Sequence, residues 1–81
     1  MKLNVYCIYD NAVKEYTQPF LMHADGEALR GFAEVVNDKT SKINKYPDDY
    51  SLHALCEWDS SNGTYTPEIP RLLKTARELL Q

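Results

Sequence analysis

Alternating apolar and polar side chains near the N-terminus predict two β-strands. The first covers residues 3–9 and is rich in aromatic and β-branched residues, which favour strands. Asp10 and Asn11 are typical of a turn, and a second strand is predicted over residues 15–22. Pro19 has no backbone N–H to donate, so it belongs at an edge or an end of that strand. Alternation along the first strand turns one set of side chains toward the core, namely Leu3, Val5, Cys7 and Tyr9.

The spacing changes to that of an amphipathic helix over residues 25–36. Asp25 is a suitable N-cap, and Asn37 ends the helical pattern. A polar loop is predicted over residues 39–49, and its last residues form a turn into the next strand. The apolar stripe of the helix recurs at helical spacing and consists of Ala28, Leu29, Phe32, Ala33 and Val36.

A third strand is predicted over residues 50–58, where apolar side chains again alternate with mostly polar ones. The run Ser-Ser-Asn-Gly at residues 60–63 is typical of a hairpin turn, and a short return strand follows over residues 64–66. The last predicted element is a helix that begins at Pro67 or Pro70, since proline is tolerated in the first helical turn. Its apolar stripe consists of Ile69, Leu72, Leu73, Ala76 and Leu80.

The chain repeats one short pattern, Cys-x-aromatic-Asp-x5-Tyr-Thr, which begins at Cys7 and again at Cys56. Coincidence is the competing explanation of so short a match. We interpret residues 1–81 as a single α+β domain made of two β-hairpin-plus-helix units, in the order ββαββα. The halves cover about residues 3–38 and 50–81, and the polar loop joins them. In this interpretation the strands form one antiparallel sheet with two helices on one face.

Size and charge limit the possible functions. A chain of 81 residues buries only roughly 60–65% of its unfolded surface, so its stability is marginal and a homodimer would be a natural way to bury more. The net charge is −3 and the pI is about 5.2, so a global positive field for nucleic acid is absent. No apolar run approaches the roughly 18 residues that a membrane span needs. Two cysteines and no resemblance to a secretory signal predict a cytosolic protein with reduced thiols.

Few side chains are candidates for catalysis or metal binding. His23, His53, Cys7 and Cys56 are the soft-metal candidates, and none forms a close-spaced pair of the kind that zinc modules use. Alternation places His53 on the strand face opposite Cys56, which argues against a nucleophile–base pair on that strand. No glycine-rich phosphate loop is present. We therefore expect no metal, no cofactor and no enzymatic activity.

The basic residues are better candidates for binding. Lysine-rich loops with exposed aromatic side chains suit a single nucleic acid strand, because phosphate contacts and base stacking need no fixed sequence. The polar loop has this composition, with Lys39, Lys42 and Lys45 followed by Tyr46 and Tyr50. Arg71, Lys74 and Arg77 recur every three residues on the predicted last helix and could follow phosphates. An ordinary solvated loop and the wet side of an amphipathic helix are the alternative interpretations.

Several short sequence blocks occur in order within residues 3–67. They are Asn4–Asp10, Pro19-Phe20, Asp25–Phe32, Val36–Asp38, Pro47–Leu52, and Trp58-Asp59 with the downstream Gly63. Together these blocks resemble the small nonstructural proteins of gokushovirus-type microviruses, the tailless single-stranded DNA phages. The chain departs from that family at Cys56, where members often have glycine, and at Trp58, where they often have phenylalanine.

The resemblance implies a nonenzymatic phage protein in the cytoplasm of the infected bacterium. Such proteins are usually assigned to the switch from DNA replication toward the production and packaging of single-stranded genomes, and are compared with the C protein of phiX-type phages. We therefore expect single-stranded DNA to be a partner. The alternative is an adaptor that contacts the phage replication or procapsid proteins without binding DNA.

Overall fold

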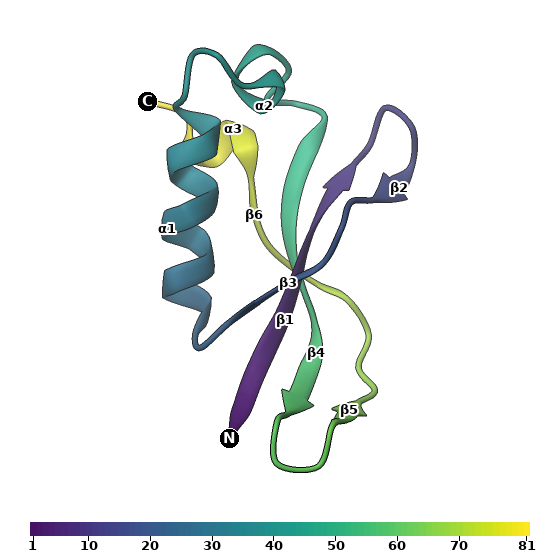
Figure 1. Ribbon diagram of the computed structural model, residues 1–81. Coiled ribbons are helices and arrows are strands. Elements are labelled where there is room, and N and C mark those ends of the chain that lie inside the picture. Colours follow the sequence, from purple (N-terminus) through teal and green to yellow (C-terminus); the bar gives the residue numbers. More distant parts are fainter.

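The computed structural model describes residues 1–81 and contains six strands and three helices (Figure 1). The predicted strands over residues 3–9, 50–58 and 64–66 and the predicted helix over residues 25–36 are confirmed. In chain order the elements are β1 (Lys2–Asp10), β2 (Glu15–Tyr16), β3 (Phe20–Met22), α1 (Asp25–Val36), α2 (Lys42–Lys45), β4 (Tyr50–Asp59), β5 (Thr64–Thr66), β6 (Arg71–Thr75) and α3 (Ala76–Leu79). None of these helices is long and apolar enough to cross a lipid bilayer.

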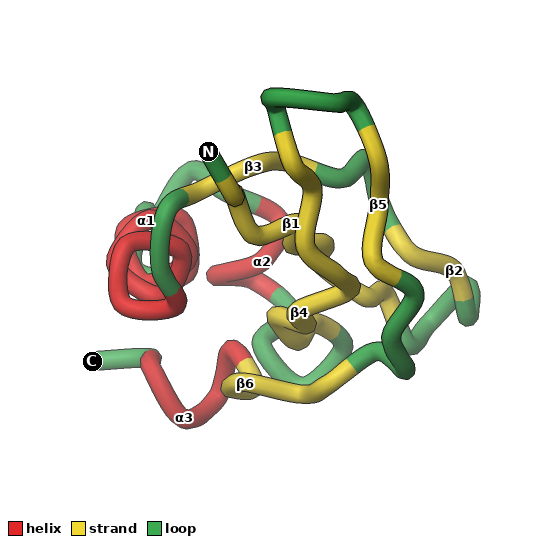
Figure 2. The backbone as a smooth tube through the Cα atoms, turned by 90° about the horizontal axis from the view of Figure 1, so that it is seen from below, coloured by secondary structure: helices red, strands yellow, loops and turns green.

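All six strands form one curled antiparallel sheet around the central pair β1–β4. β2 and β3 both pair with β1 on one side, and β5 and β6 both pair with β4 on the other. Each side of the sheet is therefore completed by two short strands in succession rather than by one long strand. Figures 1 and 2 show that β2 and β5 lie on the side of the central pair away from α1.

The two hairpins share one register. Tyr9 pairs with Tyr16 in the first hairpin, and Trp58 pairs with Tyr65 in the second, which is the same pairing 49 residues later. The residues of the Cys-x-aromatic-Asp-x5-Tyr-Thr pattern therefore occupy equivalent places in the sheet. A cross-strand aromatic pair stands near the turn of each hairpin, and such pairs stabilise a sheet by roughly 0.2–1 kcal/mol each.

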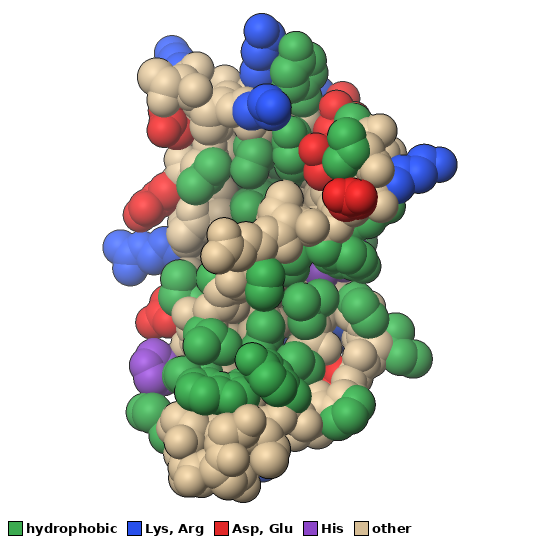
Figure 3. Space-filling view, turned by 45° about the vertical axis from the view of Figure 1, so that its right-hand side comes forward, with side chains coloured by type: hydrophobic (Ala, Val, Ile, Leu, Met, Phe, Trp, Pro, Cys, Tyr) green, Lys and Arg blue, Asp and Glu red, His purple; other side chains and the backbone are tan.

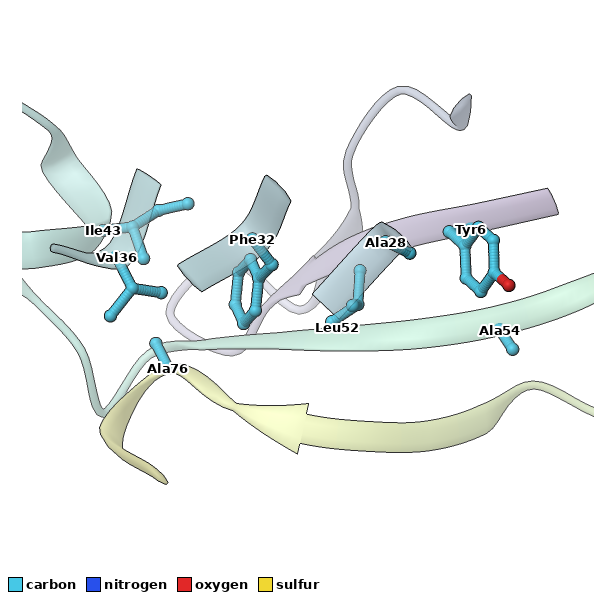
Figure 4. Packing of buried hydrophobic residues seen from close by; sticks show 8 residues of the cluster. All are labelled: Tyr6, Ala28, Phe32, Val36, Ile43, Leu52, Ala54 and Ala76. Atoms are coloured by element: carbon cyan, nitrogen blue, oxygen red, sulfur yellow. The ribbon is translucent and has the colours of Figure 1, made fainter. Parts of the chain in front are cut away.

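The core lies between the sheet and the helices, and all three helices contribute to it (Figure 4). Tyr6 is fully buried there, which corrects the predicted orientation of the first strand. Because successive side chains alternate between faces, Val5 and Cys7 lie on the opposite face of β1. The buried residues of the core are Tyr6, Leu52 and Ala54 from the sheet, Ala28, Phe32 and Val36 from α1, Ile43 from α2 and Ala76 from α3.

The observed element order differs from the predicted ββαββα. The expected second strand is divided into β2 and β3, and the expected polar loop contains the short helix α2. The predicted last helix is wrong over Arg71–Thr75, which is strand β6 and pairs with β4. Only Ala76–Leu79 is helical, because the Thr75 side chain accepts a hydrogen bond from the Glu78 N–H and the Glu78 carboxylate accepts one from the Thr75 N–H. This capping box begins the helix at Ala76.

Candidate nucleic-acid interface

The segment after α1 is held in a fixed shape by local hydrogen bonds. The Ser41 hydroxyl donates to the Val35 carbonyl at 2.6 Å and accepts from the Asn44 N–H at 3.0 Å, so it caps α2. The Asn44 amide donates to the Val36 carbonyl at 2.9 Å, and Ile43 is buried in the core. These contacts satisfy the carbonyls at the end of α1 and leave the charged side chains of the segment facing solvent.

The three lysines of this segment form one exposed cluster, which we call the lysine cluster: Lys39, Lys42 and Lys45. None of them makes an ion pair. Lys45 Nζ lies 5.5 Å from the centroid of the Tyr46 ring, and that ring is 47% exposed. In Figure 3 basic side chains gather at the upper end of the molecule, the end where Figure 1 places α2. Three exposed cations can contact phosphates, and the open aromatic ring beside Lys45 can stack on a base.

Tyr50 differs from Tyr46 because its ring is half-buried and packs against the core. Burial is the main cause that raises the pKa of the Tyr50 phenol, and the nearby carboxylates of Asp10 and Asp49 raise it further. The sequence pattern predicts the same exposed, base-stacking role for both tyrosines. In the structure, Tyr46 offers an open ring, whereas Tyr50 contributes mainly to packing.

The three basic residues near the C-terminus do not form the expected helical stripe. Arg71 and Lys74 lie on β6, and Arg77 lies on α3. Each is paired with a carboxylate. The pairs are Arg71 with Asp25 at 3.3 Å, Lys74 with Glu78 at 3.6 Å, and Arg77 with Asp48 at 2.9 Å.

Arg71 is also separated from the lysine cluster. Its partner Asp25 begins α1, and the cluster follows the other end of this 12-residue helix. At 1.5 Å per residue the two ends of the helix are roughly 17 Å apart. The structure therefore does not join Arg71 to the lysine cluster in one patch. Arg77 lies closer in space to the cluster, because Asp48 belongs to the segment that follows it.

The Arg77–Asp48 pair is bidentate. Arg77 Nε and Nη2 donate to the two carboxylate oxygens of Asp48, each at 2.9 Å. The hydrogen bonds from Arg77 hold the pKa of the Asp48 carboxyl below its usual range. The pair ties α3 to the turn before β4, and Arg77 would have to leave Asp48 before it could bind a phosphate with the same donors.

A cluster that sequence reasoning missed joins β1, α1 and β6. The Tyr6 hydroxyl donates to Asp25 Oδ1 at 2.6 Å, and Arg71 donates to Asp25 Oδ2 at 3.3 Å. The cluster borders an open cavity of about 630 Å³ whose lining also contains His23, Glu57 and Glu68 among other residues. No local sequence signal could reveal it, because its three members are far apart in the chain. The lining holds three carboxylates against the single guanidinium of Arg71, which is already paired with Asp25, so the net charge of the cavity is negative.

The Tyr6 phenol is expected to ionise well above the usual pH range of a tyrosine. Burial, followed by its hydrogen bond to Asp25, raises its pKa to about 12. Because the folded-state pKa lies above the unfolded value near 10, the contribution of Tyr6 to stability is complete below about pH 10 and is lost as the pH rises through 12. A titration of tyrosinate absorbance should show a late step that accompanies unfolding and is missing in Tyr6→Phe. A late step that persists in this variant would contradict the assignment.

The histidine and the thiols do not form a catalytic pair. Cys7 and His53 are partners across the β1–β4 ladder, but the Cys7 thiol donates to the Thr17 carbonyl at 2.7 Å and His53 Nε2 contacts the Ser51 hydroxyl at 2.9 Å. Burial raises the pKa of the Cys7 thiol and lowers that of His53, so the thiolate is disfavoured. Both cysteines are free, and no group of three or more potential ligands is placed to hold a metal ion.

Comparison with known proteins gives one match. The sequence model of a family described as "Phage ORF5 protein" matches residues 3–79. No curated protein and no solved structure matches the chain.

Proposed function

The chain belongs to the phage ORF5 protein family, and from this premise we propose that it binds single-stranded DNA through the lysine cluster and Tyr46. The proposed role is a nonenzymatic one in the infected bacterial cytoplasm, in the switch from DNA replication to the synthesis and packaging of single-stranded genomes. This is the role that the resemblance to the gokushovirus-type nonstructural proteins implies.

The distribution of the nine basic side chains carries this proposal. Arg71, Lys74 and Arg77 are neutralised by carboxylates. Lys2, Lys14 and Arg30 are exposed at scattered places on β1, the first hairpin turn and α1. The remaining three, which are Lys39, Lys42 and Lys45, are free of ion pairs and lie within seven consecutive residues, and Lys45 lies over the exposed Tyr46 ring. In a protein of net charge −3, this is a local group of three unpaired basic residues that are close in the sequence.

The hydrogen bonds that hold α2 in place support the lysine cluster as the proposed DNA-binding site. Ser41 and Asn44 fix the backbone of the segment, and the exposed lysine side chains can follow a flexible strand. Lysine acts as a point charge on a flexible stem rather than as a planar fork. Binding of this kind is independent of base sequence and sensitive to salt.

The test is fluorescence anisotropy of a labelled single-stranded oligonucleotide at several salt concentrations, with a duplex of the same sequence as control. Three phosphate contacts predict a slope of log K against log salt of about −2, from −0.7 per contact on a single strand. Tighter binding of the single strand than of the duplex is expected, because only unpaired bases can stack on Tyr46. No binding at low salt would refute the proposal.

The second candidate function is an adaptor that binds a phage replication or procapsid protein without DNA. The net charge of −3 and the neutralisation of Arg71, Lys74 and Arg77 favour it, because they weaken attraction to a polyanion. The expected result in that case is no oligonucleotide binding together with specific recovery of a viral replication or procapsid protein from infected cells. Recovery of host proteins alone would count against it.

A further inference from the structure

The face of the sheet opposite the core is largely uncovered by helices. The strand register places seven residues on this face. Tyr9 pairs with Tyr16, Cys7 with His53, His53 with Leu72, and Trp58 with Tyr65. The seven residues are Cys7, Tyr9, Tyr16, His53, Trp58, Tyr65 and Leu72. We call this face the open face. Cys7 and Tyr9 alternate with the buried Tyr6, so they point away from the core. Figures 1 and 2 show β2 and β5 curling to this side, away from α1.

Large apolar side chains remain exposed on the open face. The exposed fractions are 47% for Tyr16, 64% for Tyr65 and 53% for Leu72. In Figure 3, which brings this side of the molecule partly forward, hydrophobic side chains gather over its lower half, and basic ones stand mainly at the top and at the rims. Large apolar side chains gathered and exposed on one face are typical of an interaction site.

The open face carries no charged residue among its defining members. Burial lowers the pKa of His53, so this imidazole is neutral at pH 7. A single nucleic acid strand would find aromatic rings here but no cation to balance its phosphates. A second copy of the chain has the same net charge of −3, and this face lets two copies meet without placing like charges opposite one another.

The two ends of the open face are alike. One end has Tyr9 and Tyr16, whose ring centroids are 4.8 Å apart, and the other has Trp58 and Tyr65, at 6.5 Å. Trp58 pairs with Leu3, six residues before Tyr9, so the two pairs are about 20 Å apart along the strands. The pairs also lie on opposite sides of the central pair β1–β4. A copy related by a twofold axis in the plane of the interface therefore places an aromatic pair over an aromatic pair when the axis runs along the line that joins the two pairs or at right angles to it.

We propose that the open face is the interface at which two copies of this chain form a dimer, with their sheets packed face to face and their helices outside. Stacked sheets lie about 10 Å apart and interdigitate their inner side chains. A standard interface of about 800 Å² per partner would cover roughly one seventh of the 5460 Å² surface of the chain. The dimer is independent of DNA binding, because the lysine cluster lies outside the interface.

The first test uses Trp58 as its reporter, because it is the single tryptophan of the chain. Sedimentation equilibrium and tryptophan emission are measured over the same range of protein concentration. The expected result is a monomer–dimer transition with a parallel blue shift of emission, since Trp58 leaves water on association. A monomer at all concentrations refutes the dimer, and a dimer without a change in emission refutes this interface.

Two variants locate the interface. Leu72→Glu and Tyr65→Glu are each expected to weaken association at least tenfold, because a charge is forced into an apolar contact. The matched control is Val35→Glu, which places the same charge on a 40% exposed apolar position of α1 on the helical side. Circular dichroism establishes that each variant is folded. Equal association of all three variants overturns the proposal. A second control adds a single-stranded oligonucleotide to the wild-type monomer. A change in Trp58 emission on that addition also overturns the proposal.

Discussion

Replacing Tyr6 with alanine is expected to cost about 3–5 kcal/mol of unfolding free energy. Tyr6 is fully buried in the core and packs against Phe20, with ring centroids 5.9 Å apart. The substitution leaves a cavity and also removes the hydroxyl that donates to Asp25. Small domains have stabilities at the lower end of about 5–15 kcal/mol, so much of the stability of this chain would be lost.

Urea denaturation followed by circular dichroism measures the effect. Tyr46→Ala is the matched control, because it makes the same chemical change at a ring that is 47% exposed, and its cost should stay within about 0.5–1 kcal/mol. Tyr6→Phe separates the two contributions of the side chain, since it keeps the ring and removes only the hydrogen bond. Similar midpoints for Tyr6→Ala and Tyr46→Ala would contradict the packing described here.

Reversing the charge of the lysine cluster is expected to weaken single-stranded DNA binding by at least about 100-fold at low salt, because three phosphate contacts are replaced by three repulsions. The variant changes Lys39, Lys42 and Lys45 to glutamate. The same anisotropy measurement should show a flatter salt dependence. Stability should change little, since all three side chains are exposed and outside every ion pair.

The control for this variant changes Lys2, Lys14 and Arg30 to glutamate. These three side chains are also exposed and unpaired, so both triple variants alter the net charge by the same amount. A comparable loss in both would show that binding follows total charge rather than the cluster. Unchanged affinity in the lysine-cluster variant would refute the site.

The last element shows why sequence patterns alone misjudge some segments. Residues 71–75 combine good helix-forming side chains with helical spacing, yet they form β6 because β4 offers an edge between Ser51 and Ala54 that needs a partner. Backbone pairing with a distant strand overrides local propensity. The true start of the helix had a readable signal, since Thr75 and Glu78 have the spacing of a capping box.

The orientation of β1 was ambiguous for a different reason. Both of its faces carry apolar side chains, with Val5 and Cys7 on one and Tyr6 and Ile8 on the other. Alternation with period two identifies two faces but does not say which one the helices cover. That choice is decided by packing against Phe32 and Leu52, which are distant in the chain.

The candidate site could likewise be predicted only where its contacts are local in the sequence. Lys39, Lys42 and Lys45 are close in sequence, so their grouping in space could be predicted. The carboxylate partners of Arg71 and Arg77 lie 46 and 29 residues away, and pairings over such separations follow only from the tertiary fold. The Lys74–Glu78 pair has the usual spacing of four and could have been read from the sequence.

The central pairing of β1 with β4 determines when this chain can fold. Lys2 pairs with Asp59 and Asp10 with Tyr50, so β1 leaves the ribosome about forty residues before the strand with which it pairs. Closing so long a loop before gaining its contacts slows folding. A nascent chain that ends before Tyr50 keeps β1 without its central partner, and Val5, Tyr6 and Cys7 remain open to premature association until the second half has emerged.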